Sequence, residues 1–332
     1  MKQRLLAATA ALLLGLGLAL PAWAQTPEAL VPVGRTVGLE LETDGLYITE
    51  FNSQQDSPAK AAGLRVGDRI LTANGQALES AEALRELTAH SGGNPIILGI
   101  RRGDRAMSFT VQPQAAGDGW LLGLYLRDRV AGLGTVTFYD PETRIFGALG
   151  HGVSESGGTL LELRNGRATE TAVAAVQRGV CGTPGALLGP TGGGTLIGEI
   201  LQNTDRGIFG RGSGALLEGT PLPLAPREEV TSGPAEIWSS VTDGEPERYS
   251  VEIEAVRLDK ARCRDLRIRV TDPRLLEITG GIVQGMSGSP ILQKGKLVGA
   301  VTHVLIQDPT RGYGILIGHM LEALEDQGWQ AA

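Results

Sequence analysis

Residues 278–301 read ITGGIVQGMSGSPILQKGKLVGAV, and the segment GMSGSP (285–290) places two serines among glycines just before an apolar strand. A tight turn would account for the glycines alone, because glycine adopts backbone angles that other residues avoid. A nucleophilic serine would account for the glycines and for Ser287, since glycines let a substrate backbone approach closely. Backbone N–H groups in such a turn can also hold an oxyanion. Gly285 and Ser287 are therefore the candidate oxyanion donors, and Ser287 is the candidate nucleophile.

The same segment resembles the GDSGGP loop of chymotrypsin-like proteases, and this resemblance aligns Ser287 with the nucleophile of that class. Ser289 takes the place of a glycine, and we interpret it as a supporting residue. Gly-Ser-Gly turns are common, so a nucleophile also requires a base that takes its proton and a group that orients the base.

Composition favours a β-rich protein of two domains. The chain has 332 residues, of which 48 are glycine, and its apolar fraction of 42% contains few aromatic residues. Glycines dispersed among short Val, Ile and Leu runs are typical of many short strands joined by turns. The net charge is −7 and the sequence contains no basic stripe, so a nucleic-acid partner is not expected.

The N-terminus predicts export. Lys2 and Arg4 precede an apolar run that ends in the small-residue cleavage pattern AWAQ, with the expected cut after Ala24. The apolar run is shorter than a spanning helix requires, which favours a cleaved signal over residues 1–24 and leaves an uncleaved membrane anchor as the alternative. Residues 25 onward are then expected to fold outside the cytoplasm.

Cys181 and Cys263 are the only cysteines, and export would permit a disulfide between them. Two separate thiols are the alternative. Neither cysteine has the spacing of a metal site and no His-Glu-x-x-His motif occurs, so neither a metal nor another cofactor is expected.

Residues 34–113 resemble a PDZ domain. The order is a strand pair, then the segment AGLRVGDRILTANG, then the helix SAEALRELTAHSGG (80–93), then two strands. PDZ domains bind peptide ends by adding a strand to a sheet edge. The resemblance implies that four residues of the first strand receive the peptide and that two residues of the helix line the groove: Val37, Gly38, Leu39, Leu41, Leu84 and Leu87. Packing against a neighbouring domain is the alternative role.

Residues 113–122 are small and polar, and we interpret them as a linker. The second domain, residues 122–330, contains short apolar runs about ten residues apart, which predict a β-barrel or sandwich. Its candidate base is His151, in IFGALGHGVSE at an exposed strand end. His303 lies within VTHVLI, where alternation predicts a barrel-facing structural histidine, and His319 is expected at the surface.

Three stretches together resemble the stage IV sporulation protein B family: residues 138–155, 202–210 and 271–291. The resemblance implies a chymotrypsin-like double β-barrel after the PDZ domain, with His151 as base, Ser287 as nucleophile and Asp272 as the third catalytic residue. It also implies secretion into the space between forespore and mother-cell membranes, self-cleavage, and cleavage of a membrane-bound regulator. Asp272 lies 15 residues before Ser287, which leaves open whether it orients His151 or shapes the loop around Ser287.

Two rival hypotheses remain at this point. The chain could be an inactive PDZ adaptor that docks to a membrane complex. It could also be an HtrA-like periplasmic protease. That family places the protease before the PDZ domain, whereas this chain has the reverse order.

Overall fold

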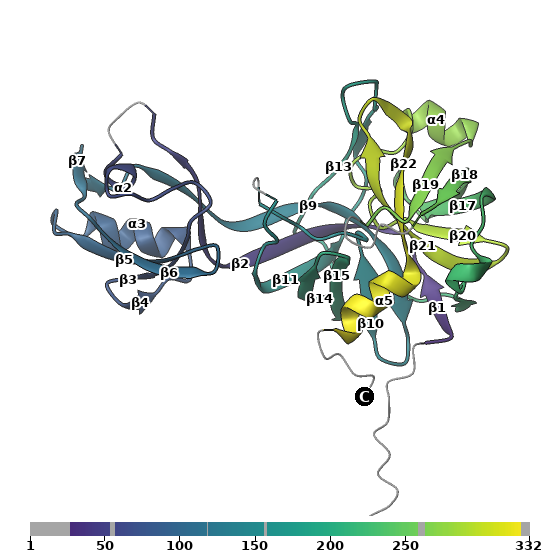
Figure 1. The fold of residues 1–332 in the computed structure, drawn as a ribbon, viewed down its shortest axis with the longest axis horizontal. Helices are drawn as coiled ribbons and strands as arrows, with labels where there is room; N and C mark the ends of the chain where they lie inside the picture. The colour runs from purple at the N-terminus through teal and green to yellow at the C-terminus, as the bar shows by residue number, and fades with distance from the viewer. Residues whose placement is uncertain (1–26, 54–56, 118, 156–157, 258–262, 327–332) are drawn as a thin grey trace, which may run out of the picture.

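The computed structural model describes residues 27–53, 57–117, 119–155, 158–257 and 263–326. Figure 1 shows a small lobe and a large lobe joined by two long strands, β2 (Thr36–Phe51) and β9 (Leu124–Asp140). The predicted signal or anchor over residues 1–24 lies outside the described residues. Among the helices that the structure describes, none is long and apolar enough to cross a membrane.

Six strands close the first barrel of the large lobe. Each pairs antiparallel with the next, and the last pairs back with the first. Their order is β2, β9, β10 (Ile145–Ala148), β15 (Gly207–Gly212), β14 (Leu196–Thr204) and β11 (Leu163–Glu170). The run VGLELE in β2 places Val37, Leu39 and Leu41 in the core while its two glutamates are more exposed, as strand alternation requires.

A second set of six strands closes the other barrel of the large lobe. The order is β17 (Gly233–Ser239), β18 (Glu247–Val256), β19 (Leu266–Val270), β22 (Asp308–Leu316), β21 (Lys296–Leu305) and β20 (Pro290–Gln293). Its interior is filled by Val, Ile and Leu side chains such as Ile237, Ile268 and Val301, all fully buried. The predicted double β-barrel is therefore confirmed.

The small lobe follows the predicted order of short elements. After β2 come α2 (Pro58–Ala61), β3 (Arg69–Ala73), β4 (Gln76–Ala77), α3 (Ala81–Ala89), β5 (Ile96–Arg102) and β6 (Arg105–Val111). Ser57 and Ser80 cap the two helices by accepting hydrogen bonds from Lys60 N and Ala83 N. Leu84 of α3 is buried in the lobe's own apolar core.

Two domain predictions need correction. The first half of β2, up to Thr43, pairs with β11 and β9 inside the first barrel, so only the end of this strand belongs to the small lobe. The segment 113–122 is not a plain linker, because it forms the hairpin of β7 (Gln114–Ala116) and β8 (Gly119–Leu121). The causes differ: strand alternation marks β2 as a strand but does not identify its pairing partner, whereas the small polar residues of 113–122 give no strand signal.

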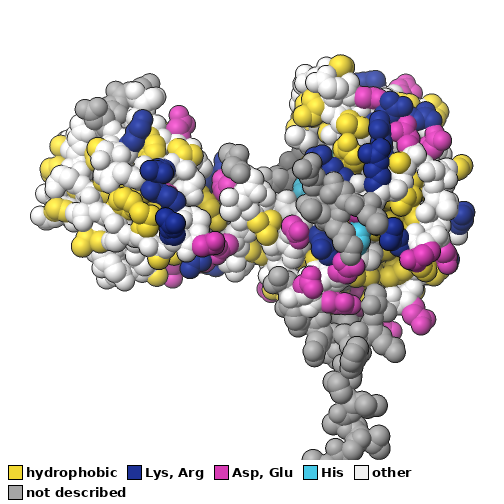
Figure 2. All heavy atoms as spheres, in the orientation of Figure 1, with side chains coloured by type: hydrophobic (Ala, Val, Ile, Leu, Met, Phe, Trp, Pro, Cys, Tyr) yellow, Lys and Arg dark blue, Asp and Glu magenta, His cyan; other side chains and the backbone are white. Residues whose placement is uncertain are grey.

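Shorter elements complete the described chain. They are β1 (Ala29–Pro32), β12 (Ala175–Gln177), β13 (Ala186–Leu188), β16 (Leu222–Pro223), the 3₁₀ turn η1 (Arg227–Glu229), α4 (Pro273–Thr279) and α5 (Ile317–Glu325). The face in Figure 2 carries basic and acidic side chains side by side on the large lobe. Ion pairs of the second barrel include Arg267 with Glu254 and Arg311 with Glu254.

The two cysteines are both free, so the alternative of separate thiols holds. Cys181 is exposed, whereas Cys263 is buried and its Sγ donates to Asp205 O at 2.9 Å. Burial raises the pKa of the Cys263 thiol to about 12, which keeps it protonated and unreactive at neutral pH.

A buried polar pair fastens α5 to the second barrel. Asp265 is fully buried, and its Oδ2 accepts hydrogen bonds from Leu316 N at 3.0 Å and His319 Nδ1 at 2.7 Å. His319 is itself only 5% exposed, so the expectation of a surface role for this histidine is wrong. The apolar side chains of α5 pack into the core, and His319 is buried because it lies on the same helix.

We predict that Asp265→Ala lowers the free energy of unfolding by about 3 kcal/mol, because it leaves the buried Leu316 N–H and the His319 ring without their acceptor. Chemical denaturation would measure the loss. Asp243→Ala, at an exposed position on the same barrel, is the control and should change stability by less than about 0.5 kcal/mol. Equal stabilities for the two variants would contradict the assignment.

Candidate active site

A cleft of about 450 Å³ lies where the two barrels meet. The first barrel contributes residues of β2 and β9 and the loop that follows β10, and the second contributes the loop before β20 and the end of β21. Three polar side chains with catalytic potential line it: His151, Ser287 and His303. The structure therefore brings the predicted nucleophile and the predicted base into one cavity.

The loop around Ser287 is held by the first barrel. Thr135 of β9 donates from its backbone N–H to Ser287 O at 2.9 Å and from its hydroxyl to Gly285 O at 2.8 Å. Gly285 and Gly288 have φ of +97° and +96°, a region that favours glycine. A Cβ on Gly288 would lie 1.9 Å from Thr135 O, so this position also requires glycine for space.

The backbone N–H groups of Gly285 and Ser287 donate to no acceptor within the described part of the chain, whereas neighbouring N–H groups are bonded. Met286 N donates to Val283 O and Gly288 N donates to Val301 O. Unpaired N–H groups beside a nucleophile are what an oxyanion hole needs. Ser289 is fully buried and donates from its hydroxyl to Ser239 Oγ at 3.0 Å, consistent with the expected supporting role.

His151 follows a strained backbone segment at the end of β10. Leu149 and Gly150 both have φ of +68°, which is uncommon for leucine and is often found at functional sites. The Nδ1 of His151 lies 2.9 Å from Gly152 O. A carbonyl can only accept, so Nδ1 carries the proton and Nε2 keeps the lone pair that a general base uses.

Within the described residues, the hydroxyl of Ser287 makes no hydrogen bond to His151. It donates to Thr302 O at 2.8 Å. Hydrogen bonds between catalytic groups often form only with substrate bound, so this arrangement is compatible with a Ser287–His151 pair in the shared cleft.

Asp272 is not among the residues that line the cleft. It caps α4, where its carboxylate accepts from Arg274 N at 3.0 Å and Ser250 N at 3.2 Å. The hydrogen bond from the Arg274 guanidinium is the main reason that the pKa of Asp272 lies below its ordinary value. Of the two roles left open for Asp272, the geometry favours shaping the segment that leads to Ser287 over orienting His151.

His303 is the residue that sequence reasoning missed. Alternation in VTHVLI predicts that its side chain points toward a barrel, but it lies in the cleft with its ring centroid 5.0 Å from that of His151. A bulge at Val301–His303 interrupts the regular pairing of β21 with β22. Such bulges re-aim side chains and leave no clear signal in a single sequence.

The predicted peptide-binding strand needs correction as well. Val37, Gly38, Leu39 and Leu41 are paired on one edge with β11 and on the other with β9, so no edge is open for a peptide. Three of them, Val37, Leu39 and Leu41, fill the core of the first barrel.

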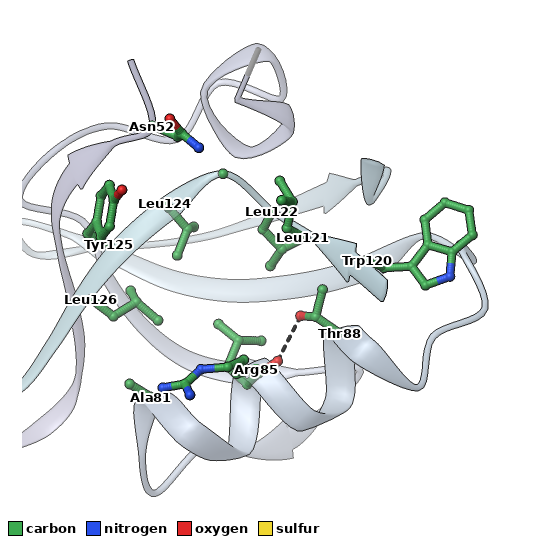
Figure 3. A pocket seen from close by; sticks show the side chains of 12 residues that line it. Asn52, Ala81, Arg85, Thr88, Trp120, Leu121, Leu122, Leu124, Tyr125 and Leu126 are labelled. Carbon is green, nitrogen blue, oxygen red and sulfur yellow. Dashed lines mark hydrogen bonds between the residues drawn. The ribbon is translucent and has the colours of Figure 1, made fainter. Parts of the chain in front are cut away.

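A groove of about 440 Å³ lies instead between α3 and the segment 120–126 (Figure 3). Leu84 lines it as predicted, whereas Leu87 is not among its lining residues and packs against the lobe's core. The N–H groups of Leu122 and Gly123 have no acceptor among the residues that the structure describes, and Gly123 has φ of +70°. The alternation of Leu122, Leu124 and Leu126 was the available signal, obscured by the surrounding glycines.

These features define a class of protein: a serine peptidase on two β-barrels with an attached PDZ domain. Profiles of known families agree, since the SpoIVB peptidase S55 family matches residues 118–321 and a PDZ domain matches residues 52–102. The first match spans more than half of the chain. The protein therefore belongs to the SpoIVB peptidase S55 family.

Curated relatives match over shorter stretches. The chain is 37% identical over 86 residues to the putative zinc metalloprotease all3971 of Nostoc sp., and 30% identical over 115 residues to the putative zinc metalloprotease BH06270 of Bartonella henselae. These stretches are 25% and 35% of this chain. They span 24% and 32% of those proteins.

Two solved structures are similar in part. The PDZ domain of the SdrC-like protein of Listeria monocytogenes is 27% identical with a TM-score of 0.23, covering 26% of this chain and 90% of that one. The active form of the Rv3671c protease from M. tuberculosis is 17% identical with a TM-score of 0.34, covering 60% of this chain and 74% of that one.

We predict that Gly288→Ala destabilises the protein by about 3 kcal/mol and abolishes labelling of Ser287 by a fluorophosphonate, because the new Cβ collides with Thr135 O. Gly295→Ala is the matched control: Gly295 also has positive φ, at +78°, but nothing lies within 4 Å of its Cβ position. That variant should lose only about 1 kcal/mol and keep full labelling. Denaturation and labelling together check both expectations.

A second prediction concerns pH. Burial holds the pKa of His151 below its ordinary value of 6.5, with the Gly152 carbonyl opposing in part. A general base works when neutral, so a lowered pKa extends activity to lower pH. The rate of fluorophosphonate labelling should fall only below pH 6.5, as His151 gains its proton. A half-maximal rate above pH 7 would contradict this assignment of the base.

Proposed function

We propose that this protein is an exported endopeptidase that cleaves itself and a membrane-associated regulatory protein during spore formation. The observation that carries the proposal is the shared cleft, which is lined by Ser287, His151 and two backbone N–H groups that have no acceptor in the described chain. The family name and the predicted export signal support the sporulation setting, in the space between forespore and mother-cell membranes.

In the proposed mechanism, Ser287 Oγ attacks the peptide carbonyl while His151 Nε2 takes its proton. The N–H groups of Gly285 and Ser287 donate to the oxyanion of the tetrahedral intermediate. His151 then protonates the leaving amine, and water, activated by the same imidazole, releases the acyl group from Ser287. These steps use side chains, backbone donors and water alone.

The walls of the cleft favour apolar substrate side chains. They carry aliphatic groups from both barrels and, within the described residues, no Asp, Glu, Lys or Arg. The aliphatic members are Leu39, Leu41, Val130, Leu133, Leu149, Val153, Ile282, Val283, Val304 and Ile306. A charged side chain placed there would lose its hydration without gaining a partner. We therefore propose aliphatic residues next to the cleaved bond.

We predict that residues 25–332 fragment on incubation and that Ser287→Ala stays intact and unlabelled by a fluorophosphonate. Mass spectrometry of the fragments would locate the first cleavage sequence, which should carry aliphatic residues. Ser213→Ala is the matched control, because it makes the same change at an exposed serine outside the cleft. If the wild type stays intact and unlabelled, the alternative of an inactive PDZ adaptor is favoured.

The PDZ groove is the proposed binding site for a peptide end, either of the substrate or of this chain. On the edge of β9 away from β2, Leu124–Leu126 pair with no strand that the structure describes, so this edge can accept an added strand. The N–H groups of Leu122 and Gly123 can donate to a carboxylate. Figure 3 shows Ala81 and Thr88 of α3 facing this edge across the groove.

We predict that Ala81→Phe fills the groove and weakens binding of an apolar peptide with a free C-terminal carboxylate at least roughly tenfold. Fluorescence anisotropy would measure it. Glu86→Phe adds the same ring to α3 outside the groove and should bind like the wild type. Equal binding of a peptide whose C-terminus is amidated would contradict the carboxylate site.

A further inference from the structure

The cleft contains no carboxylate that could orient the base. No Asp or Glu of the described chain lines it, and Asp272 is engaged at the start of α4 by Ser250 and Arg274. In serine peptidases a third group usually holds the histidine ring in its working orientation. Here the carbonyl of Gly152 sets the tautomer of His151, but it lies on the adjacent residue and restrains the ring from one side only.

His303 occupies the space on the other side of this ring. The two imidazole centroids are 5.0 Å apart with planes tilted by 39°, which is contact distance for aromatic rings. His303 is carried by β21, where it lies opposite Tyr313 of β22. His303 of the second barrel thus packs its ring against His151 of the first barrel.

One nitrogen of His303 is left without a partner. Its Nδ1 is buried and makes no hydrogen bond to any residue that the structure describes. Buried polar atoms are nearly always paired, so an orphan in a cleft indicates a role in another state of the site. A neutral imidazole carries one lone pair that can face positive charge, such as the imidazolium that forms on His151 when Ser287 attacks.

The surroundings keep His303 neutral. Burial is the main reason that its pKa falls to about 4, and the charges of His151 and Arg264 act in the same direction. Arg264 lies over the ring of Tyr313, the neighbour of His303 on β22, at 4.9 Å. At neutral pH the His303 ring therefore adds no positive charge beside the base.

We propose that His303 is the residue that positions the general base: its uncharged ring packs against His151, restrains it beside Ser287 and stabilises the imidazolium during acyl transfer. This inference rests on the proposed peptidase function and assigns the third place in the site to a histidine in β21. Asp272 then acts on the fold of α4 and the segment that follows it.

The test compares three variants by fluorophosphonate labelling across pH. His303→Phe keeps the ring and removes both nitrogens, and His303→Gln restores a polar acceptor. His90→Phe is the matched control at an exposed position directly after α3. For His303→Phe we expect the maximal labelling rate to fall roughly 10- to 100-fold with the reagent's binding constant unchanged. The acid limb should move to lower pH by about 0.5 unit or more, because the imidazolium loses a stabilising neighbour.

His303→Gln should recover part of the rate, and His90→Phe should match the wild type. A His303→Phe protein that labels within twofold of the wild type with an unmoved acid limb overturns the inference. The inference is also overturned if the His303→Phe protein is less stable to heat and labels in a smaller fraction of molecules while its labelling rate is unchanged. That result would mean that His303 has only a structural role. If the wild type itself is not labelled, the proposed function fails together with the inference.

A measurement that needs no activity separates these cases further. In the Ser287→Ala background, NMR titration of the imidazole nitrogens reports the pKa of His151 directly. We expect His303→Phe to lower that pKa and His90→Phe to leave it unchanged. An unmoved pKa in the His303→Phe protein overturns the inference even where the wild type proves active.

Discussion

The position of Thr135 is the constraint on which the active site depends. This residue of β9 donates twice to the nucleophile loop, to Ser287 O and Gly285 O, and its own carbonyl accepts from Leu149 N at 3.2 Å. One fully buried threonine thus connects the loop of the second barrel to the strained segment before His151. Neither barrel alone contains the proposed site, because Ser287 and His151 come from different barrels.

The close approach of the barrels explains why certain positions must be glycine. Gly288 faces Thr135 O, and Gly150 lies against Thr302 and Ile315 of the second barrel at about 3.0 Å for an added Cβ. Gly134 packs below Leu149 and Leu39 in the same region. Side chains at Gly288 and Gly150 would push the barrels apart, and a shift of about 1 Å at a catalytic group is enough to lower rates strongly.

Much of the fold was predictable because its signals are local. Short apolar runs, Asn-Gly and Asp-Gly turns, and serine caps at Ser57 and Ser80 mark the elements, and GMSGSP marks the nucleophile. The two mistakes about strands concern pairing. Residues 37–41 and 122–126 both alternate, and only the closed first barrel decides which run is buried and which borders the groove.

The prediction of the third site residue failed for a related reason. Asp272 precedes proline, a pattern that equally marks a helix cap, and the structure shows the cap. His303 reads as one more position of an alternating strand, and the bulge that turns it toward His151 depends on contacts between barrels. Residues whose role arises from the meeting of two domains carry little information in their own neighbourhood of the chain.

One consequence follows from β9 being a single strand. Its first residues border the peptide groove of the small lobe, and Thr135, about 33 Å further along at 3.3 Å per residue, holds the nucleophile loop. The same strand therefore borders the peptide groove and holds the loop that carries Ser287. A peptide that binds the groove more tightly in one conformation of that strand must favour the corresponding conformation of the loop. By thermodynamic reciprocity, a substrate bound in the cleft then changes the affinity of the groove for the peptide.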